Sequence, residues 1–455
     1  MLRASTAAAR RLVFPTTRVM TSSPLFRPLV ALALCFFVAK AHALQPLDEF
    51  LRQAESSNFD NREIRAQQKQ RKYEVNTTRA RLLPNFEARG TYTHNQYAAI
   101  ATLPVGGETQ RLVITPKNQW DAFFTVNVPV IDVAGHVELR GARELARAAD
   151  ADRDNTKLSV QRQIVQAYYQ LLAYASLREA AKEAMDAAAK NAEVVQQRRA
   201  GGVASELDVQ QANANLERTK QDLANAELNE ALGRRQLETL SGLTPEAISS
   251  FPTDDLHEEA PLEQWIKEVD ADLPSNRAAA ARARAAESAR RAAAYAFLPT
   301  LSATAQERIT NATGFLGRSS YYYLGASLTW QLDGALVPRL KAQRAAQEAE
   351  EVRKERTQRQ NQDFVYEAWH RIRSDIARSR AARAQASATA KAAELAAERY
   401  TGGVATQLDV VQAQRDAFAA TASRVQADAD LALSRAQLRL GTGRLLNAKQ
   451  SDRAR

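Results

Sequence analysis

Few residues of this chain have the types and spacing that chemistry requires. The five histidines and the single cysteine, Cys35, are scattered, so they form no cluster suited to metal binding or nucleophilic catalysis. We find no phosphate-binding loop and no nucleophile beside a base. The sequence therefore predicts neither an enzyme nor a bound metal or cofactor.

Two aspartates stand out because they recur in one short phrase. The phrase reads GGVASELDV from Gly201 and GGVATQLDV from Gly402, 201 residues later. Paired glycines between long alanine-rich runs predict a tight turn that joins two antiparallel helices. Asp208 and Asp409 then lie near the start of the second helix, where a carboxylate can cap the helix or compensate its dipole.

The net charge of +10 gives little support to a nucleic-acid partner. Six basic residues lie before residue 44, where the sequence has no acidic residue, and the charges of the remaining chain are nearly balanced. These charges are interspersed along helical runs, as solvated helix faces usually are. We therefore expect no nucleic acid to bind.

The N-terminal segment, residues 1–43, has the composition of an export signal peptide. An apolar core from Leu29 to Ala39 precedes an Ala-x-Ala-like end at Ala43, and this core is too short to span a bilayer as a helix. Translation from Met20 would give the usual length of such a signal, and an organellar presequence is the alternative. Cys35 follows Leu34 inside the apolar core, which does not fit a lipid attachment site.

The remaining chain consists of two copies of one unit. Residues 47–84 match residues 262–299 at an offset of 215, and residues from Asp132 onward match at an offset of 201. The difference places a 14-residue insertion around 98–117, whose Gly, Pro and Thr content predicts a longer loop. The predicted domains are repeat one at 44–242, a linker at 243–260, repeat two at 261–443 and a tail at 444–455.

Each repeat has the same order of elements. A helical run, 47–81 or 262–296, ends at a Leu-Pro pair, because proline disfavours helical geometry in the residue before it. Alternation of apolar and polar residues then predicts two hairpins, with strong strands at 119–130 and 319–332 and weaker ones at 85–95 and 300–310.

A helix of about 66 residues, roughly 100 Å long, follows each hairpin. A return helix, 203–240 or 404–440, comes after each glycine pair. Small residues recur at every seventh position of the return helices, which predicts close packing against a neighbouring helix. They are Ala212, Thr219, Ala226 and Gly233, and then Ala413, Ala420, Ala427 and Ser434.

The strands could form a small soluble sheet with one face on a core. The export signal, strands of about ten residues and aromatic residues near the strand ends instead favour strands that span a membrane with the apolar face outward. Four strands cannot close a barrel, because the smallest membrane barrels have about eight strands and lipid does not tolerate exposed edges. Several chains must then contribute to one barrel.

The doubled order of helix, Leu-Pro, hairpin, long helix, Gly-Gly-Val phrase and return helix resembles the TolC-type outer membrane efflux protein family from about Leu47 to Gly443. The resemblance implies a mainly α fold with a membrane β-barrel. A homotrimer would form twelve strands, four from each chain, and continue as an α-helical tunnel across the periplasm. The resemblance also implies the outer membrane of a Gram-negative bacterium as the location, in contact with outer membrane lipid.

The resemblance further assigns roles to the two tips. A periplasmic adaptor (membrane fusion) protein would contact them, and a gate would lie just inside. Asp208 and Asp409 match acidic positions that would give six carboxylates in a trimer, a ring that favours cations. Tyr400 matches a tyrosine that helps to close the gate between neighbouring helix pairs, whereas a second acidic position of some members is Gln412 here. The adaptor-contact residues would be Gly201, Gly202, Val203, Gly402, Gly403 and Val404.

The sequence thus predicts a passive exit channel of a tripartite efflux or secretion system, opened at its periplasmic tip by an adaptor and an inner membrane transporter of the RND or ABC type. The alternative is a periplasmic coiled-coil adaptor or scaffold protein without a membrane barrel. Drug efflux and protein secretion both stay open as functions, and only three methionines give no support to a copper or silver route.

Overall fold

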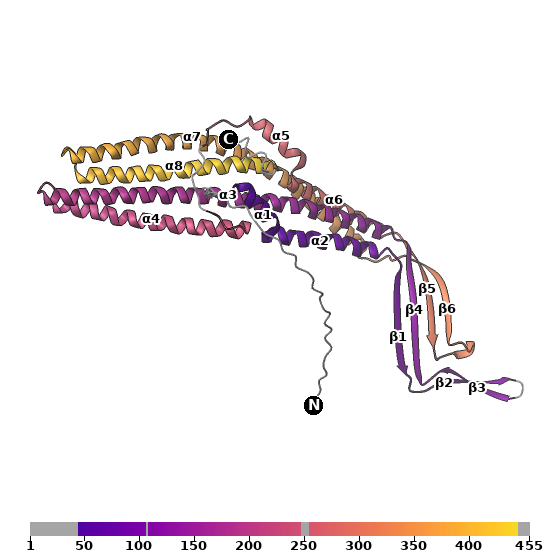
Figure 1. Ribbon diagram of the computed structural model, residues 1–455. Coiled ribbons are helices and arrows are strands. Elements are labelled where there is room, and N and C mark those ends of the chain that lie inside the picture. Colours follow the sequence, from indigo (N-terminus) through magenta and orange to yellow (C-terminus); the bar gives the residue numbers. More distant parts are fainter. Residues whose placement is uncertain (1–43, 106–107, 247–253, 445–455) are drawn as a thin grey trace, which may run out of the picture. The chain divides into compact units, whose positions relative to one another are not determined.

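Helices account for 70% of the fold, and antiparallel strands for a smaller part. The computed structural model describes residues 44–105, 108–246 and 254–444 (Figure 1). The predicted signal peptide, the tail beyond Arg444 and residues 247–253 of the predicted linker lie outside the described residues. No helix in the described part of the chain is both long enough and apolar enough to cross a membrane.

The same order of elements occurs twice along the chain. The first set is α1 (Leu47–Ser57), α2 (Phe59–Ala80), β1 (Asn85–His94), β4 (Asn118–Ile131), α3 (Val133–Ala200) and α4 (Glu206–Ser241). The second set is α5 (Leu262–Asp272), α6 (Pro274–Tyr295), β5 (Thr300–Thr310), β6 (Ser320–Thr329), α7 (Leu336–Thr401) and α8 (Gln407–Gly441). A short 3-10 helix, η1 (Gly314–Leu316), lies between β5 and β6.

The first helical run of each set is broken, which corrects the prediction of one continuous helix. Asn58 has an extended backbone and its side chain accepts a hydrogen bond from the Asn61 amide, so it ends α1 and caps α2. In the second set Leu273 is extended because Pro274 follows it and starts α6. Each break lets the short leading helix, α1 or α5, turn back onto the long helices.

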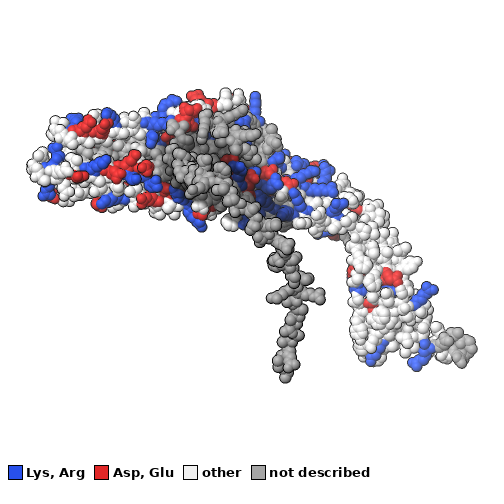
Figure 2. Space-filling view, in the orientation of Figure 1, with Lys and Arg blue, Asp and Glu red and all other residues white. Residues whose placement is uncertain are grey.

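Four strands form one antiparallel sheet in the order β1-β4-β5-β6. The register pairs Tyr92 with Trp120 and Ala305 with Leu324, so the apolar side chains share one face. In Figure 2 the sheet region shows few charged residues, whereas Lys, Arg, Asp and Glu are mixed over the helices. The large side chains of this face that are at least 40% exposed include Phe86, Tyr92, Trp120, Phe124, Tyr322, Leu324 and Leu328. The predicted apolar face is therefore present and exposed.

The opposite face of the sheet is polar and internally bonded. Gln306 Nε2 donates to Thr125 Oγ1 at 2.8 Å, and the Arg308 guanidinium bonds to Asp121 Oδ1 at 2.8 Å. Because these bonds join β4 to β5, they connect the hairpin of the first set to the hairpin of the second.

The inserted segment of the first set is not the loop that the sequence predicted. It contains β2 (Ala99–Val105) and β3 (Glu108–Thr115), which pair as a separate two-stranded sheet. The described chain therefore has six strands rather than four. β-Branched residues such as Ile100, Val113 and Ile114 occur on both strands and favour extended structure more than the Gly and Pro content suggested.

Two long helical hairpins, α3–α4 and α7–α8, lie side by side, because α8 packs along α3 (Figure 1). The seven-residue column of small residues is buried in the α3–α4 hairpin, as predicted. Gly233 is in close contact with the Tyr174 ring, so that a Cβ there would come within 2.9 Å of it. The corresponding pair in α7–α8 is polar, since Ser434 Oγ donates to Asp375 Oδ2 at 2.5 Å.

The two short leading helices bury aromatic side chains against the long ones. Phe50 of α1 packs with Ile164, Leu171 and Leu237, and Trp265 of α5 packs with α7 and α8. Residues 254–260 of the predicted linker run alongside, where Arg435 binds Asp254 at 2.9 Å and Glu259 at 2.6 Å. These clusters fix the bases of both hairpins.

We expect Leu237→Ala to weaken the α3–α4 hairpin. Leu237 is fully buried, and truncating such a leucine costs about 2–5 kcal/mol through lost burial and a residual cavity. Lys220→Ala on the same helix is the control, because its ion pair with Glu217 is exposed and such pairs contribute about 0–1 kcal/mol. The measurement is thermal loss of helical circular dichroism, and equal melting of both variants would contradict this packing.

Candidate gate and docking site at the helical tips

Each helical hairpin ends in a turn that requires glycine. Gly202 and Gly403 have φ of 75° and 77°, in the left-handed region that L side chains avoid. The amides of the following valines bond back to Arg198 O and Arg399 O, both at 2.9 Å. This is the Schellman pattern, in which a left-handed residue satisfies the last carbonyls of a helix. The two predicted tips are thus built alike.

Four apolar side chains project at these turns. Val203 and Val404 are each 69% exposed, and Leu207 and Leu408 are 65% and 58% exposed. The valines were predicted as contact residues, but the leucines were not, although both belong to the repeated phrase. Exposed apolar groups at the end of a charged hairpin are typical of a surface that another protein covers.

Asp208 and Asp409 complete capping boxes at the starts of α4 and α8, so the predicted role in helix capping is confirmed. The Asp208 carboxylate accepts hydrogen bonds from the Ser205 amide at 2.8 Å and the Ser205 hydroxyl at 2.7 Å. Asp409 accepts the same two bonds from Thr406, also at 2.8 and 2.7 Å. In return, the Asp208 amide donates to Ser205 Oγ and the Asp409 amide donates to Thr406 Oγ1. Such reciprocal bonds satisfy amides at a helix start that have no intrahelical partner. These hydrogen bonds do not test the gate role of the two aspartates, which stays a prediction.

Asp409 carries a charge that the tip stabilises. Hydrogen bonds from the Thr406 backbone and side chain, together with the positive charge of Arg399, hold the pKa of the Asp409 carboxyl below its ordinary value. Since the side chain is exposed at the end of the hairpin, it presents a negative charge to solvent at neutral pH.

Tyr400 joins the two hairpins at the tips. It is 6% exposed and packs in a cluster with Val195 of α3 and Val209 of α4. The Arg198 guanidinium lies over its ring, 4.9 Å from the centroid, and donates to Thr401 O at 2.9 Å. Burial, followed by the negative charge of Asp208, raises the pKa of the Tyr400 phenol, so the hydroxyl stays protonated at neutral pH.

The structure thus brings together some of the predicted gate residues and adds one. Tyr400 and Asp208 are electrostatically coupled across the two hairpins, whereas Asp409 is influenced by Arg399 of its own hairpin. The sequence analysis did not identify Arg198 as a gate residue. The one indication in the sequence is that Arg198 directly precedes Arg199, which corresponds to Tyr400 in the second repeat. Its role depends on a contact between helices about 200 residues apart.

The two tips differ in the contacts of the residues that flank the turn. In the first tip Arg199 forms an ion pair with Glu206, while in the second tip the corresponding residues are Tyr400 and Gln407. Gln407 is 1% exposed, and its amide makes no hydrogen bond with another described residue. An exposed ion pair therefore joins the two helices of the first tip, whereas the corresponding residues of the second tip are buried.

One group of side chains in the described chain has the spacing of a metal site. It consists of Asp254, Asp255 and His257, near the hairpin bases. Arg435, which is buried, already binds Asp254, and His257 Nδ1 lies 2.6 Å from Asp255 Oδ1. Because a fixed cation occupies this cluster, we assign it no metal.

Solved structures with the same fold are outer membrane channels. The outer-membrane channel OprN matches with a TM-score of 0.74 and 21% identity, over 87% of this chain and 89% of that one. The CmeC channel of Campylobacter jejuni matches at 0.75 and 18%, over 90% and 89%. VceC of Vibrio cholerae matches at 0.71 and 18%, over 87% and 96%. At these identities the likeness defines the class of fold.

The family itself follows from a sequence match. The model of the outer membrane efflux protein family matches residues 50–243 and 265–444, and the chain therefore belongs to that family. No curated protein sequence matches the chain. The protein is an outer membrane efflux channel, and channels of this family are passive conduits rather than enzymes. The family works in tripartite efflux systems as trimeric channels.

We expect the second tip to loosen in acid. The pKa of Asp409 is lowered in the folded tip, so its contribution to stability is complete above the unfolded value and is lost as pH falls through the folded one. The loss should occur below pH 3.8, the ordinary value. Hydrogen exchange at 407–410, corrected for intrinsic rates, should show falling protection in the unmodified protein. Asp409→Ala should show low protection with no acid step, and an identical acid step in both proteins would refute the assignment.

Proposed function

We propose that three copies of this chain form a twelve-stranded barrel in the outer membrane of a Gram-negative bacterium and continue as a helical tunnel into the periplasm. The observation that supports this most is the four-stranded sheet, whose apolar face is exposed and whose outer strands, β1 and β6, have one partner each among the described residues. Three such sheets would pair every edge, as lipid requires.

In this proposal the chain is organised as two repeats, 44–242 and 261–443, joined by a linker at 243–260. An export signal at 1–43 precedes them and a tail at 444–455 follows. The long hairpins α3–α4 and α7–α8 contribute two tips per chain and six per trimer. A periplasmic adaptor protein docks on the tips through the exposed Val203, Leu207, Val404 and Leu408, together with the glycine turns at Gly201-Gly202 and Gly402-Gly403. An inner membrane transporter of the RND or ABC type supplies the energy.

The gate in this proposal consists of Asp208, Tyr400 and Asp409. Tyr400, held by Arg198, keeps the two hairpins of one chain together. The six aspartates of a trimer place negative charge around the constriction, which favours the passage of cations. The adaptor opens the gate by separating the hairpins.

Removal of the Asp409 charge should change conduction. We expect Asp409→Ala to raise single-channel conductance or weaken cation preference in planar bilayers, because it removes a capping box and one carboxylate per chain from the tip. Glu348→Ala is the control, because Glu348 lies on the same α7–α8 hairpin, roughly 80 Å from the tip. Unchanged current and selectivity in Asp409→Ala would exclude the residue from the gate.

The Arg198 contact should hold the tips closed. Arg198→Ala removes the guanidinium over the Tyr400 ring and the bond to Thr401 O, and a cation–π contact of this kind contributes about 0.5–2 kcal/mol. We expect a higher open probability in bilayers, by a few-fold or more, than with Arg199→Ala, which breaks an ion pair confined to the first tip. Equal open probabilities for the two variants would contradict a role for Tyr400 in closing.

A further inference from the structure

The two ends of the four-stranded sheet carry different connections. At one end the strands join the helices α2, α3, α6 and α7, and at the other β1 leads into the β2–β3 hairpin and β5 leads through η1 into β6 (Figure 1). Because β3 packs against η1, the connections of both hairpins lie together. We call residues 95–105, 108–117 and 311–319 the outer rim. In the proposed channel the helices lie in the periplasm, so the outer rim faces the cell exterior.

The apolar face of the sheet ends just before the outer rim. Trp120 is its last large side chain on β4, and Val130, ten residues further along the strand, lies near the helical end. Ten residues of strand span about 33 Å. At a tilt of about 40° they give a band about 25 Å tall, which is the height of the apolar band of outer membrane barrels. The outer rim is therefore at the level of the lipid headgroups.

Three basic residues of the outer rim have no acidic partner. Arg111, Lys117 and Arg318 are exposed, and none of them forms an ion pair or a side-chain hydrogen bond with another residue in the described part of the chain. Over residues 95–117 and 311–319 the sequence has a single acidic residue, Glu108. Lys and Arg are visible at this end of the sheet in Figure 2. The outer rim thus has an excess of positive charge.

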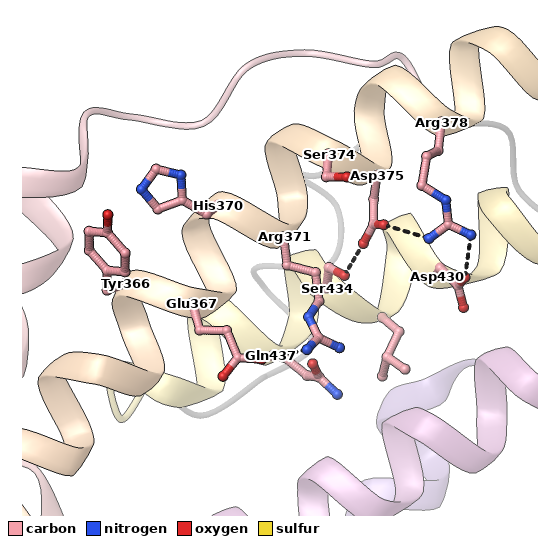
Figure 3. Close-up of a pocket in the computed structure, with 11 residues that line it drawn as sticks. Tyr366, Glu367, His370, Arg371, Ser374, Asp375, Arg378, Asp430, Ser434 and Gln437 are labelled. Atoms are coloured by element: carbon pink, nitrogen blue, oxygen red, sulfur yellow. Dashed lines mark hydrogen bonds and ion pairs between the residues drawn. The ribbon is translucent and has the colours of Figure 1, made fainter.

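Other arginines of the chain lie beside carboxylates. On the polar face of the sheet, Arg308 binds Asp121 at 2.8 Å. Between α7 and α8, Arg378 binds Asp375 at 3.2 Å and Asp430 at 3.6 Å (Figure 3). The cations of the outer rim differ from these because their charge is not compensated nearby, which leaves them able to attract an anion from outside the chain.

Apolar side chains accompany the cations of the outer rim. On η1, Phe315 and Leu316 are 70% and 72% exposed, and on the β2–β3 hairpin Ile100 and Val113 are each 44% exposed. A two-stranded hairpin has little stability of its own in water, and exposed apolar groups gathered in this way are typical of a surface that another molecule covers. Cations beside apolar groups fit a partner that has acyl chains and an anionic headgroup.

We propose that the outer rim binds the phosphate groups of lipids in the outward-facing leaflet, with Arg111, Lys117 and Arg318 as the contact residues. In Gram-negative bacteria this leaflet consists of glycolipids whose acylated sugars carry phosphates. Arginine binds phosphate oxygens through two parallel hydrogen bonds, and lysine supplies a point charge. The inference rests on the proposed function and adds a lipid partner to it. In a trimer these contacts surround the barrel and hold it at one depth in the membrane.

Lipid binding to the full chain tests this proposal. The protein is extracted from the membrane in detergent, titrated with diphosphoryl lipid A and measured by native mass spectrometry. The test variant combines Arg111→Ser, Lys117→Ser and Arg318→Ser. Since one basic residue at an anionic membrane surface strengthens attraction about fivefold, we expect this variant to bind lipid A at least tenfold more weakly than the unmodified protein.

A matched control removes the same number of cations elsewhere. Lys182, Arg356 and Arg359 are exposed on α3 and α7 and likewise lack an ion pair among the described residues. The variant that combines Lys182→Ser, Arg356→Ser and Arg359→Ser should bind lipid A as the unmodified protein does. If the triple test variant does not assemble, Arg318→Ser alone, which lies outside the strands, should still weaken binding about fivefold.

Two further ligands separate the lipid from its phosphate. Phosphatidylethanolamine, which is zwitterionic, should bind equally to all variants, and inorganic phosphate in excess should not displace lipid A. Three-chain particles whose lipid A binding is the same in the test and control variants would overturn the proposal and leave the channel standing, and so would displacement by inorganic phosphate. Recovery of the protein as a soluble single chain would contradict the proposed function itself.

Discussion

The backbone hydrogen bonds of the four-stranded sheet constrain the rest of the structure. Strands β4 and β5 are paired on both sides, but β1 and β6 each have one partner among the described residues. An unpaired backbone group in lipid costs several kcal/mol, and a strand has a row of them. The exposed aromatic face of the same strands makes lipid the expected surroundings. The proposed trimer follows from these two facts together, because each edge then meets an edge of the next chain.

The helices are positioned by the strands that lead into them. Asp132 follows β4 directly, and its side chain accepts the Gly135 amide at 2.8 Å, so α3 begins where the strand ends. The long helices then continue along a direction set at the sheet, and α8 packs on α3. Both hairpins end in the same Schellman turn and capping box. The repeat therefore reproduces its local structure closely, while Arg199, Tyr400 and Gln407 make the tips unequal. The proposed gate depends on this difference between the tips. The contact of Tyr400 with the first hairpin has no counterpart at Arg199, and it is the contact that must separate when the gate opens.

Much of this fold could be predicted from the sequence because it is encoded locally. The four main strands and the long helices are predicted by three local features. These are the change from helical to strand periodicity, the Leu-Pro pairs and the paired glycines. The break at Asn58 could not be predicted, because one extended residue hardly changes the helical periodicity of the residues around it. The Gly and Pro residues between 98 and 117 predict a loop, but the β-branched residues of the same segment form the β2–β3 hairpin. Arg198 could not be predicted, because its contact with Tyr400 exists only when two distant hairpins lie side by side.

The central claim is that the strands of one chain are completed by those of its copies in the outer membrane. Native mass spectrometry of the mature protein extracted from that membrane tests this claim most directly. The account predicts particles of three chains, with no monomer until the strands unfold. Recovery of the protein as a soluble periplasmic particle of one chain would contradict it.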